Sequence, residues 1–347
     1  MQFGIFSNSR RPFRTQAETW KEDLFEVQLA DELGMEEAWI SEHTSPAELI
    51  ICKAAAMTSR IKLGSAVRPL AYHHPLQVAI EANACDNLTD GRYQLGIGTG
   101  FGGGYMAQRG LDDTQRREMM HAALDLILKL WAANGQPIDY DGPYWHGTGL
   151  VLKQPTVQKP HPPVAVAAGQ NIGTVKLAAE RGFKLLTGDF NPPDRLRRFR
   201  AVFEETSRAA GYTDAQRRFA VTRVIYVAET DQEAVEDMRA SYNETITWEI
   251  ANTPWHQIER VPPGGTLQDI TYDYLVESKN LFIGSPETVY ENIRELYDHV
   301  GGFGLLMFHA GRDYATREKR EQSMRLFMRE VAPRLRALDR ERQLVAA

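Results

Sequence analysis

Short apolar runs alternate along the chain with longer segments whose apolar residues recur at helical spacing, and this alternation predicts strands that are each followed by a helix. The predicted strands lie at residues 2–7, 37–41, 61–67, 93–97, 164–168, 183–187, 219–227 and 303–308. The predicted helices lie at residues 16–33, 46–57, 76–88, 112–133, 173–181, 194–210, 232–241 and 318–338, with a further helix capped by Ser285 and Pro286. The pattern favours an α/β fold, a (β/α)8 TIM barrel with an insertion after strand seven, over an open doubly wound sheet.

Two segments depart from this alternation. Residues 134–162 are polar and aromatic and are expected to be a long connection with a small hairpin. Residues 242–279 fit neither period and are rich in Trp, Pro and Gly, so we predict a lid or binding segment there. Because no linker composition separates two halves, the sequence predicts a single domain over residues 1–347 with 242–279 as an insertion within it.

Composition narrows the classes of function. A net charge of -6 disfavours a nucleic-acid partner. Cys52 and Cys85 are the only cysteines and lie in apolar helical segments, so we expect packing residues, no disulfide and a reducing compartment. The first residues do not have a signal-peptide pattern and no apolar run is long enough to span a membrane, so a cytoplasmic location without membrane contact is expected.

The strongest local pattern is a strand–helix–strand unit at residues 60–104 that ends in a glycine-rich loop. Gly98-Thr99-Gly100 begins a formal G-x-G-x-x-G match that continues through residues 101–103. The polar stretch after the loop does not supply the helix that a dinucleotide-binding fold needs. Two interpretations stay open: the glycines let a ligand approach the carboxyl end of a strand, or they form a tight turn.

Several side chains are candidates for chemistry. His43 follows the second predicted strand, where an imidazole can transfer a proton or serve as a structural hydrogen-bonding group. His73 and His74 are adjacent on extended chain and point in opposite directions, so we predict no metal. Residues 170–174 open a helix and form either an anion site or an ordinary N-cap. Two roles are possible for Arg10, Arg11 and Arg68: they could bind an anionic group, or they could form salt bridges at the rim of the barrel.

The order of seven segments resembles the bacterial luciferase-like flavin monooxygenases. These segments are FGIFSN, AWISEH, RIKLGSAVRPLAYHHPLQVA, LTDGRYQLGIGTGFGGGYM, LWAANGQPIDYDGPYWHG, PHPPVAVAAGQNIGTVKLAAERG and FIGSPETV. Together they cover nearly the whole chain and are most similar to the diketocamphane and limonene monooxygenase branch.

The resemblance implies a homodimer of (β/α)8 barrels that binds reduced FMN (FMNH2) supplied by a separate flavin reductase, with O2 as co-substrate. Oxygen would add at the flavin C4a position, and the peroxyflavin would oxygenate a small organic substrate, for example a ketone or aldehyde in a Baeyer–Villiger reaction. Three alternatives remain: an F420-dependent hydride-transfer oxidoreductase on the same barrel, a non-catalytic flavin-binding partner subunit, and a nicotinamide dehydrogenase.

By position, the resemblance makes His43 the catalytic proton-transfer candidate and places a cis peptide bond between Ala66 and Val67 under the flavin ring. It also implies cofactor contacts from two loops. The first loop contributes Gly98, Thr99 and Gly100. The second loop binds the phosphate and contributes Gln170, Asn171, Gly173 and Thr174. Thr99 departs from luciferase, which carries a phosphate-binding arginine there. We therefore expect weaker phosphate binding unless Arg68 or another basic group substitutes.

Overall fold

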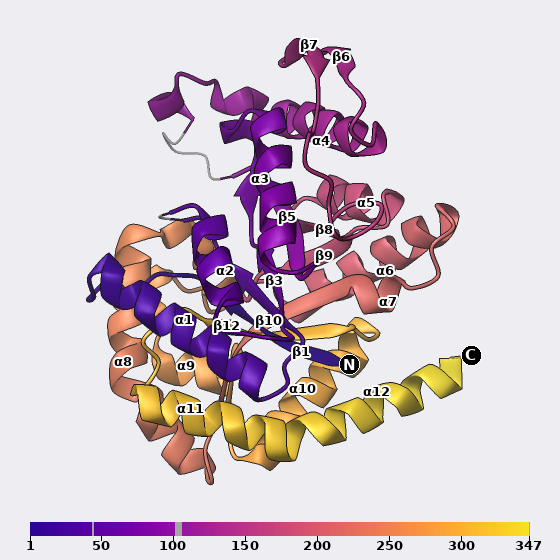
Figure 1. The fold of residues 1–347 in the computed structure, drawn as a ribbon. Helices are drawn as coiled ribbons and strands as arrows, with labels where there is room; N and C mark the ends of the chain where they lie inside the picture. The colour runs from indigo at the N-terminus through magenta and orange to yellow at the C-terminus, as the bar shows by residue number, and fades with distance from the viewer. Residues whose placement is uncertain (44, 101–105, 347) are drawn as a thin grey trace. The chain divides into compact units, whose positions relative to one another are not determined.

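A computed structural model describes residues 1–43, 45–100 and 106–346 of the chain (Figure 1). Its residues form two compact units. Unit 1 comprises Met1–Glu37 with Ala168–Ala347, and unit 2 comprises Ala38–Ala167. Among the described residues, no helix is both long enough and apolar enough to cross a membrane.

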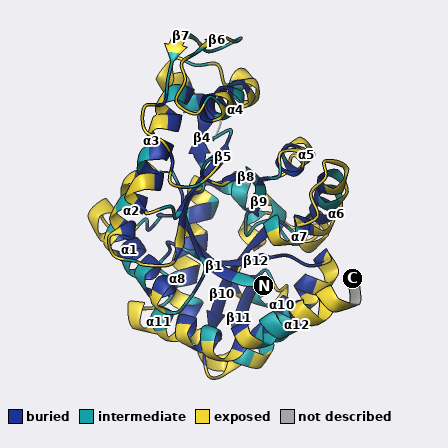
Figure 2. Ribbon diagram, turned by 45° about the vertical axis from the view of Figure 1, so that its right-hand side comes forward, coloured by how far each residue is buried: buried dark blue, intermediate teal, exposed yellow. Residues whose placement is uncertain are grey.

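Unit 1 is built on parallel strands that are buried along nearly their whole length. β12 (Leu305–Ala310) pairs with both β1 (Gln2–Ser7) and β10 (Phe219–Val227), and β10 also pairs with β9 (Lys184–Thr187). All nine residues of β10 are buried, as expected of a parallel strand covered on both faces. A short strand, β11 (Leu281–Gly284), lies beside the second half of β10. Figure 2 shows these strands in dark blue and the outward helix faces in yellow.

The helices of unit 1 follow its strands, and several of them begin at side-chain caps. Thr15 forms a capping box at the start of the first helix, and Thr230 and Ser285 cap two later ones. The helices are α1 (Gln16–Glu32), α5 (Ile172–Glu180), α6 (Pro193–Ala209), α7 (Ala215–Arg218), α8 (Asp231–Asn252), α9 (Tyr272–Glu277), α10 (Pro286–Val300), α11 (Arg317–Leu326) and α12 (Ala332–Ala346).

Unit 2 repeats the alternation. Its parallel strands are β2 (Glu37–Ile40), β3 (Lys62–Ser65), β5 (Tyr93–Gly98) and β8 (Val164–Ala168), and the short β4 (Arg68–Pro69) also pairs with β5. Its helices are α2 (Ala47–Ala55), α3 (Pro75–Leu88) and α4 (Arg116–Ala132). The expected hairpin is present as the antiparallel pair β6 (Ile138–Asp141) and β7 (His146–Leu150).

Close backbone approach explains two glycines in these strands. A Cβ added to Gly64 would lie 2.4 Å from the ring of Trp39, and one added to Gly96 would lie 1.8 Å from the carbonyl oxygen of Ser65. Ser65 also accepts a hydrogen bond from the Gly96 amide at its hydroxyl, at 3.2 Å. The indole of β2 therefore packs directly on the backbone of β3 only because no side chain intervenes.

Taken together, the described residues of the two units hold eight parallel strands that are each followed by a helix, with the additional β4 and β11. This is the (β/α)8 barrel that the sequence predicts. Strand positions agree with the predicted ones to within a few residues because each strand is a continuous apolar run with a turn signal at each end.

Three details of the prediction are wrong. The helix expected to end at residue 241 continues as α8 to Asn252, and β11 is a strand that the apolar pattern did not identify. The last predicted helix is interrupted by five residues in π-helical conformation, Phe327–Val331. The extension of α8 was missed because its buried face includes Thr245 and Glu249, which read as polar in the sequence.

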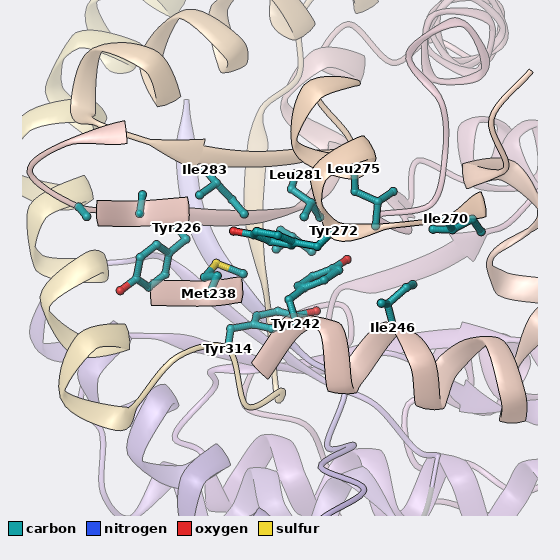
Figure 3. Packing of buried hydrophobic residues seen from close by; sticks show 13 residues of the cluster. Tyr226, Met238, Tyr242, Ile246, Ile270, Tyr272, Leu275, Leu281, Ile283 and Tyr314 are labelled. Carbon is teal, nitrogen blue, oxygen red and sulfur yellow. The ribbon is translucent and has the colours of Figure 1, made fainter. Parts of the chain in front are cut away.

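A buried aromatic cluster holds the ends of the 242–279 segment in unit 1 (Figure 3). The ring of Tyr242 lies 5.6 Å from that of Tyr272 and 5.4 Å from that of Tyr314. Ile246 enters this cluster from the start of the segment and Leu275 from its end. The segment is therefore not one long loop: its helical ends are packed in the core, and its middle forms the short 3-10 turns Pro254–His256, Ile258–Arg260 and Leu267–Asp269.

Candidate active site

In unit 2, His43 lies in the bend that follows β2, and its side chain is half-buried. Its neighbour Glu42 places one carboxylate oxygen 2.9 Å from Nε2 of His73 and accepts a hydrogen bond from Arg68 at 3.1 Å. The segment that carries His43 is thus fixed by charged contacts at the carboxyl end of a barrel strand, where barrel enzymes place their catalytic groups.

Arg68 is the centre of a buried charge network. Besides Glu42, its guanidinium donates to Glu48 at 3.2 Å and to Glu81 at 2.5 Å. Burial raises the pKa of Glu48, although the nearby guanidinium opposes this effect. Of the two alternatives that the sequence left open, the structure favours salt bridging for Arg68, and its contacts provide no evidence that it replaces the arginine missing at position 99.

The Ala66–Val67 peptide bond is cis, as the family resemblance implies. Both residues are half-buried, between β3 and β4. A Cβ on Gly98 would lie 2.6 Å from Val67, and one on Gly100 would lie 2.4 Å from the Tyr72 ring. These glycines therefore make room for protein side chains, and Gly100 also has a φ of 75°, which favours glycine. The later glycines of the predicted loop, at positions 102–104, lie outside the described residues.

In unit 1, residues Gln170 and Asn171 connect β8 to α5 and are exposed. Asn171 caps the helix because its Oδ1 accepts a hydrogen bond from the Thr174 amide at 3.2 Å. Gly173 is also exposed, and a Cβ there would lie 2.9 Å from Asn171 Oδ1. Nε2 of Gln170 donates to Glu259 Oε1 at 3.1 Å. The predicted N-cap is therefore present, at a helix start whose amides suit an anion.

Glu259 belongs to the 3-10 turn Ile258–Arg260, in the middle of the 242–279 segment. The oxygen that Gln170 contacts also accepts a hydrogen bond from Nη2 of Arg195, at 2.7 Å. Arg195 lies in the first turn of α6. Neither residue was a candidate from the sequence, and neither stands in a recognisable motif.

A second group of buried charges in unit 1 was also missed. Nδ1 of His309, at the end of β12, lies 2.9 Å from Oδ2 of Asp189, and its Nε2 lies 3.1 Å from Nδ2 of Asn8. Arg260 also donates to Asp189. Asn8 and Asp189 lie just after β1 and β9, and His309 lies at the end of β12, so these three residues gather at the carboxyl end of the strands of unit 1. The sequence signal that was available is that Asn8, Asp189 and His309 each lie at or just after the end of a buried strand.

The electrostatics of this group favour a charged carboxylate. Burial alone would raise the pKa of Asp189, but His309 and Arg260 hold it well below its ordinary value. Burial lowers the pKa of Arg223 to about 10. Its guanidinium donates to the backbone oxygen of Asn191 at 2.9 Å and thereby fixes the loop that carries Asp189.

The remaining candidates have structural contacts. Arg11 is buried and forms ion pairs with Asp23 and with Glu26, the latter at 2.9 Å, so salt bridging is again the interpretation that the structure favours. Arg10 lies over the ring of Trp248, with its central carbon 5.7 Å from the centroid. Cys52 and Cys85 are free thiols whose sulfurs lie 3.7 Å apart.

The family model for luciferase-like monooxygenases matches residues 1–302. The chain belongs to this family. It is 28% identical to 3,6-diketocamphane 1,6-monooxygenase of Pseudomonas putida, with 95% of this chain and 97% of that protein covered. It is 29% identical to limonene 1,2-monooxygenase of Rhodococcus erythropolis, over 90% of this chain and 80% of that protein.

A solved structure gives the same assignment. It is a type II Baeyer–Villiger monooxygenase, the oxygenating constituent of 3,6-diketocamphane monooxygenase from Pseudomonas putida, in complex with FMN. The TM-score is 0.84 at 27% identity, and the match covers 96% of this chain and 98% of the other. As a member of the luciferase-like family, the chain is a flavin-dependent monooxygenase with a TIM-barrel fold.

Proposed function

We propose that the protein is the oxygenating component of a two-component system that uses reduced FMN and O2 to oxygenate a small organic substrate, with Baeyer–Villiger oxidation of a ketone or aldehyde as the best-supported reaction. The observation that carries this proposal is the likeness to the FMN complex of a Baeyer–Villiger monooxygenase over 96% of this chain. A flavin reductase would be the separate partner, and a homodimer is the assembly that the family resemblance implies.

The donor set of unit 1 fits the phosphate of FMN. Gln170 and Arg195 both direct N–H groups at one carboxylate oxygen of Glu259, and this arrangement supports an anion site at this place. The start of α5 adds backbone amides, and Thr174 adds a hydroxyl. In this proposal Gln170, Asn171, Gly173 and Thr174 form the phosphate turn.

In the proposal, unit 2 supplies contacts with the flavin ring. The residues assigned to it are Ala66, Val67, Gly98, Thr99 and Gly100. When bound, reduced FMN would supply the oxygen-transfer chemistry with O2. The protein would orient the ring, exclude water and handle protons. His43 would hold or transfer a proton at an imidazole nitrogen beside the ring, because an imidazole changes its charge near neutral pH.

The 242–279 segment is the proposed lid over the substrate. Its packed ends would serve as anchors, and the turns in its middle would contact the substrate. Substrate selection would then depend on residues 254–269, whose regular structure is limited to short 3-10 turns.

The test uses chemically reduced FMN, O2 and a cyclic ketone, with product, oxygen consumption and hydrogen peroxide measured together. Wild-type protein is expected to couple oxygen consumption to product. His43→Ala is expected to lose coupling and release peroxide instead. His146→Ala, which changes an exposed histidine of β7, is the control and is expected to behave as wild type.

Two outcomes would contradict the proposal. Unchanged coupling in His43→Ala would remove this residue from the mechanism. Tight binding of F420 without any reaction of reduced FMN would replace oxygenation by hydride transfer on the same barrel.

A further inference from the structure

The inference concerns the basic group that replaces the arginine missing at position 99, and it rests on the proposed function. Arg195 lies in the first turn of α6, and its Nη2 donates to Glu259 Oε1 at 2.7 Å. The same oxygen accepts from Gln170 at 3.1 Å. The side chains of Arg195 and Glu259 are 23% and 22% exposed, so a ligand from solvent can reach this ion pair.

The ion pair with Glu259 engages only one of the two Nη atoms of Arg195. Nη1 of Arg195 is buried, and within residues 1–43, 45–100 and 106–346 it has no hydrogen-bond partner. A single carboxylate oxygen takes one N–H of Arg195 and one of Gln170, whereas a phosphate group presents three oxygens. A phosphate at this place can accept from both Nη atoms of the guanidinium and from the amide at once, and bidentate geometry of this kind is favoured for arginine.

Two of the three arginines that the sequence raised already have carboxylate partners within the protein. Arg68 contacts three carboxylates, and Arg11 is buried between Asp23 and Glu26. Within the described residues, Arg195 differs from them because it pairs with a single carboxylate, that of Glu259 in a turn of the 242–279 segment.

We propose that Arg195, together with Gln170, holds the phosphate of the flavin, and that the carboxylate of Glu259 occupies the same donors until the phosphate displaces it. Both groups are anions, so they compete for the donors. Binding of FMN would therefore release the turn Ile258–Arg260 from this contact. Arg260, the next residue, would keep the turn attached through Asp189.

The test compares FMN with riboflavin, which lacks the phosphate, by fluorescence titration of purified protein. Arg195→Ala is expected to weaken FMN binding by about tenfold or more, the effect of losing a charge-assisted contact, and to change riboflavin binding less than about twofold. Glu259→Gln keeps an acceptor oxygen but removes the charge. It is expected to tighten FMN binding several-fold and to leave riboflavin binding unchanged.

Arg197→Ala is the matched control. Arg197 lies on the same helix, is 62% exposed and pairs only with the exposed Asp194 among the described residues, at 3.3 Å. Its loss is expected to leave the ratio of FMN to riboflavin affinity as in wild type. Because Glu259→Gln tests the same contact from the other partner, the proposal does not depend on Arg195→Ala folding normally.

The outcomes separate this inference from the proposed function. If wild type binds FMN more tightly than riboflavin but Arg195→Ala keeps the same preference, the assignment of Arg195 is wrong and the oxygenase proposal stands. Weaker FMN binding by Glu259→Gln would overturn the competition between carboxylate and phosphate. If wild type binds neither flavin, in oxidised or reduced form, both proposals are overturned.

Discussion

Asp189 and His309 are 120 residues apart in the sequence, yet Oδ2 of the first lies 2.9 Å from Nδ1 of the second. Their side chains are 11% and 4% exposed. His299 and Asp194 form a pair of the same length, 2.9 Å, but there the side chains are 40% and 77% exposed. The two pairs share their chemistry and differ in burial, which makes them a matched comparison.

Asp189→Ala is expected to lower the free energy of unfolding by about 3–5 kcal/mol, because it leaves the buried Arg260 without its closest counter-charge. Asp194→Ala removes the exposed carboxylate, whose interactions are screened by water, and is expected to be indistinguishable from wild type. Urea unfolding at pH 7 measures both. Equal losses in the two variants would show that burial does not set the strength of these pairs.

Glu48 provides a test of pH dependence. Burial raises its pKa in the folded protein, so the folded state binds a proton more readily than the unfolded chain. Stability due to this group therefore rises as the pH falls through the folded pKa toward the unfolded value. Relative to Glu48→Gln, which cannot titrate, wild type is expected to gain stability between pH 7 and about 4.5. A difference that stays constant over unfolding curves at several pH values would contradict this direction.

Gly96 tests the close packing of β5 on β3. A Cβ there would meet the Ser65 carbonyl oxygen at 1.8 Å, so Gly96→Ala is expected to destabilise the protein by about 1–3 kcal/mol or more. Apart from its chain neighbours, no residue that the structure describes has an atom within 4 Å of the Cβ position of Gly169, and Gly169→Ala is expected to change stability by less than about 0.5 kcal/mol. Thermal unfolding compares the two variants. A stable Gly96→Ala protein would show that the strands can separate to admit a methyl group.

Much of the fold was predictable from the sequence because each strand is a local apolar run and each helix a local repeat. Most residues of β10, for example, are apolar and contiguous in the chain. The strand and the turns beside it can therefore be identified from neighbouring residues alone. The cis geometry of the Ala66–Val67 bond and the role of His43 as the proton-transfer candidate were available only from the resemblance, since neither has a periodic signal.

The chain by itself determined the order of strands and helices, the barrel class and the place of His43 at a strand end, because these depend on neighbours in sequence. Only the tertiary structure decided that Asp189 meets His309 and that Glu259 meets Arg195. Each of these pairs joins segments at least 64 residues apart, and the charge of one partner is compensated only when the chain folds back to the other. No local sequence pattern predicts such a pairing, because the interaction energy of the two side chains depends on burial and geometry that exist only in the folded protein.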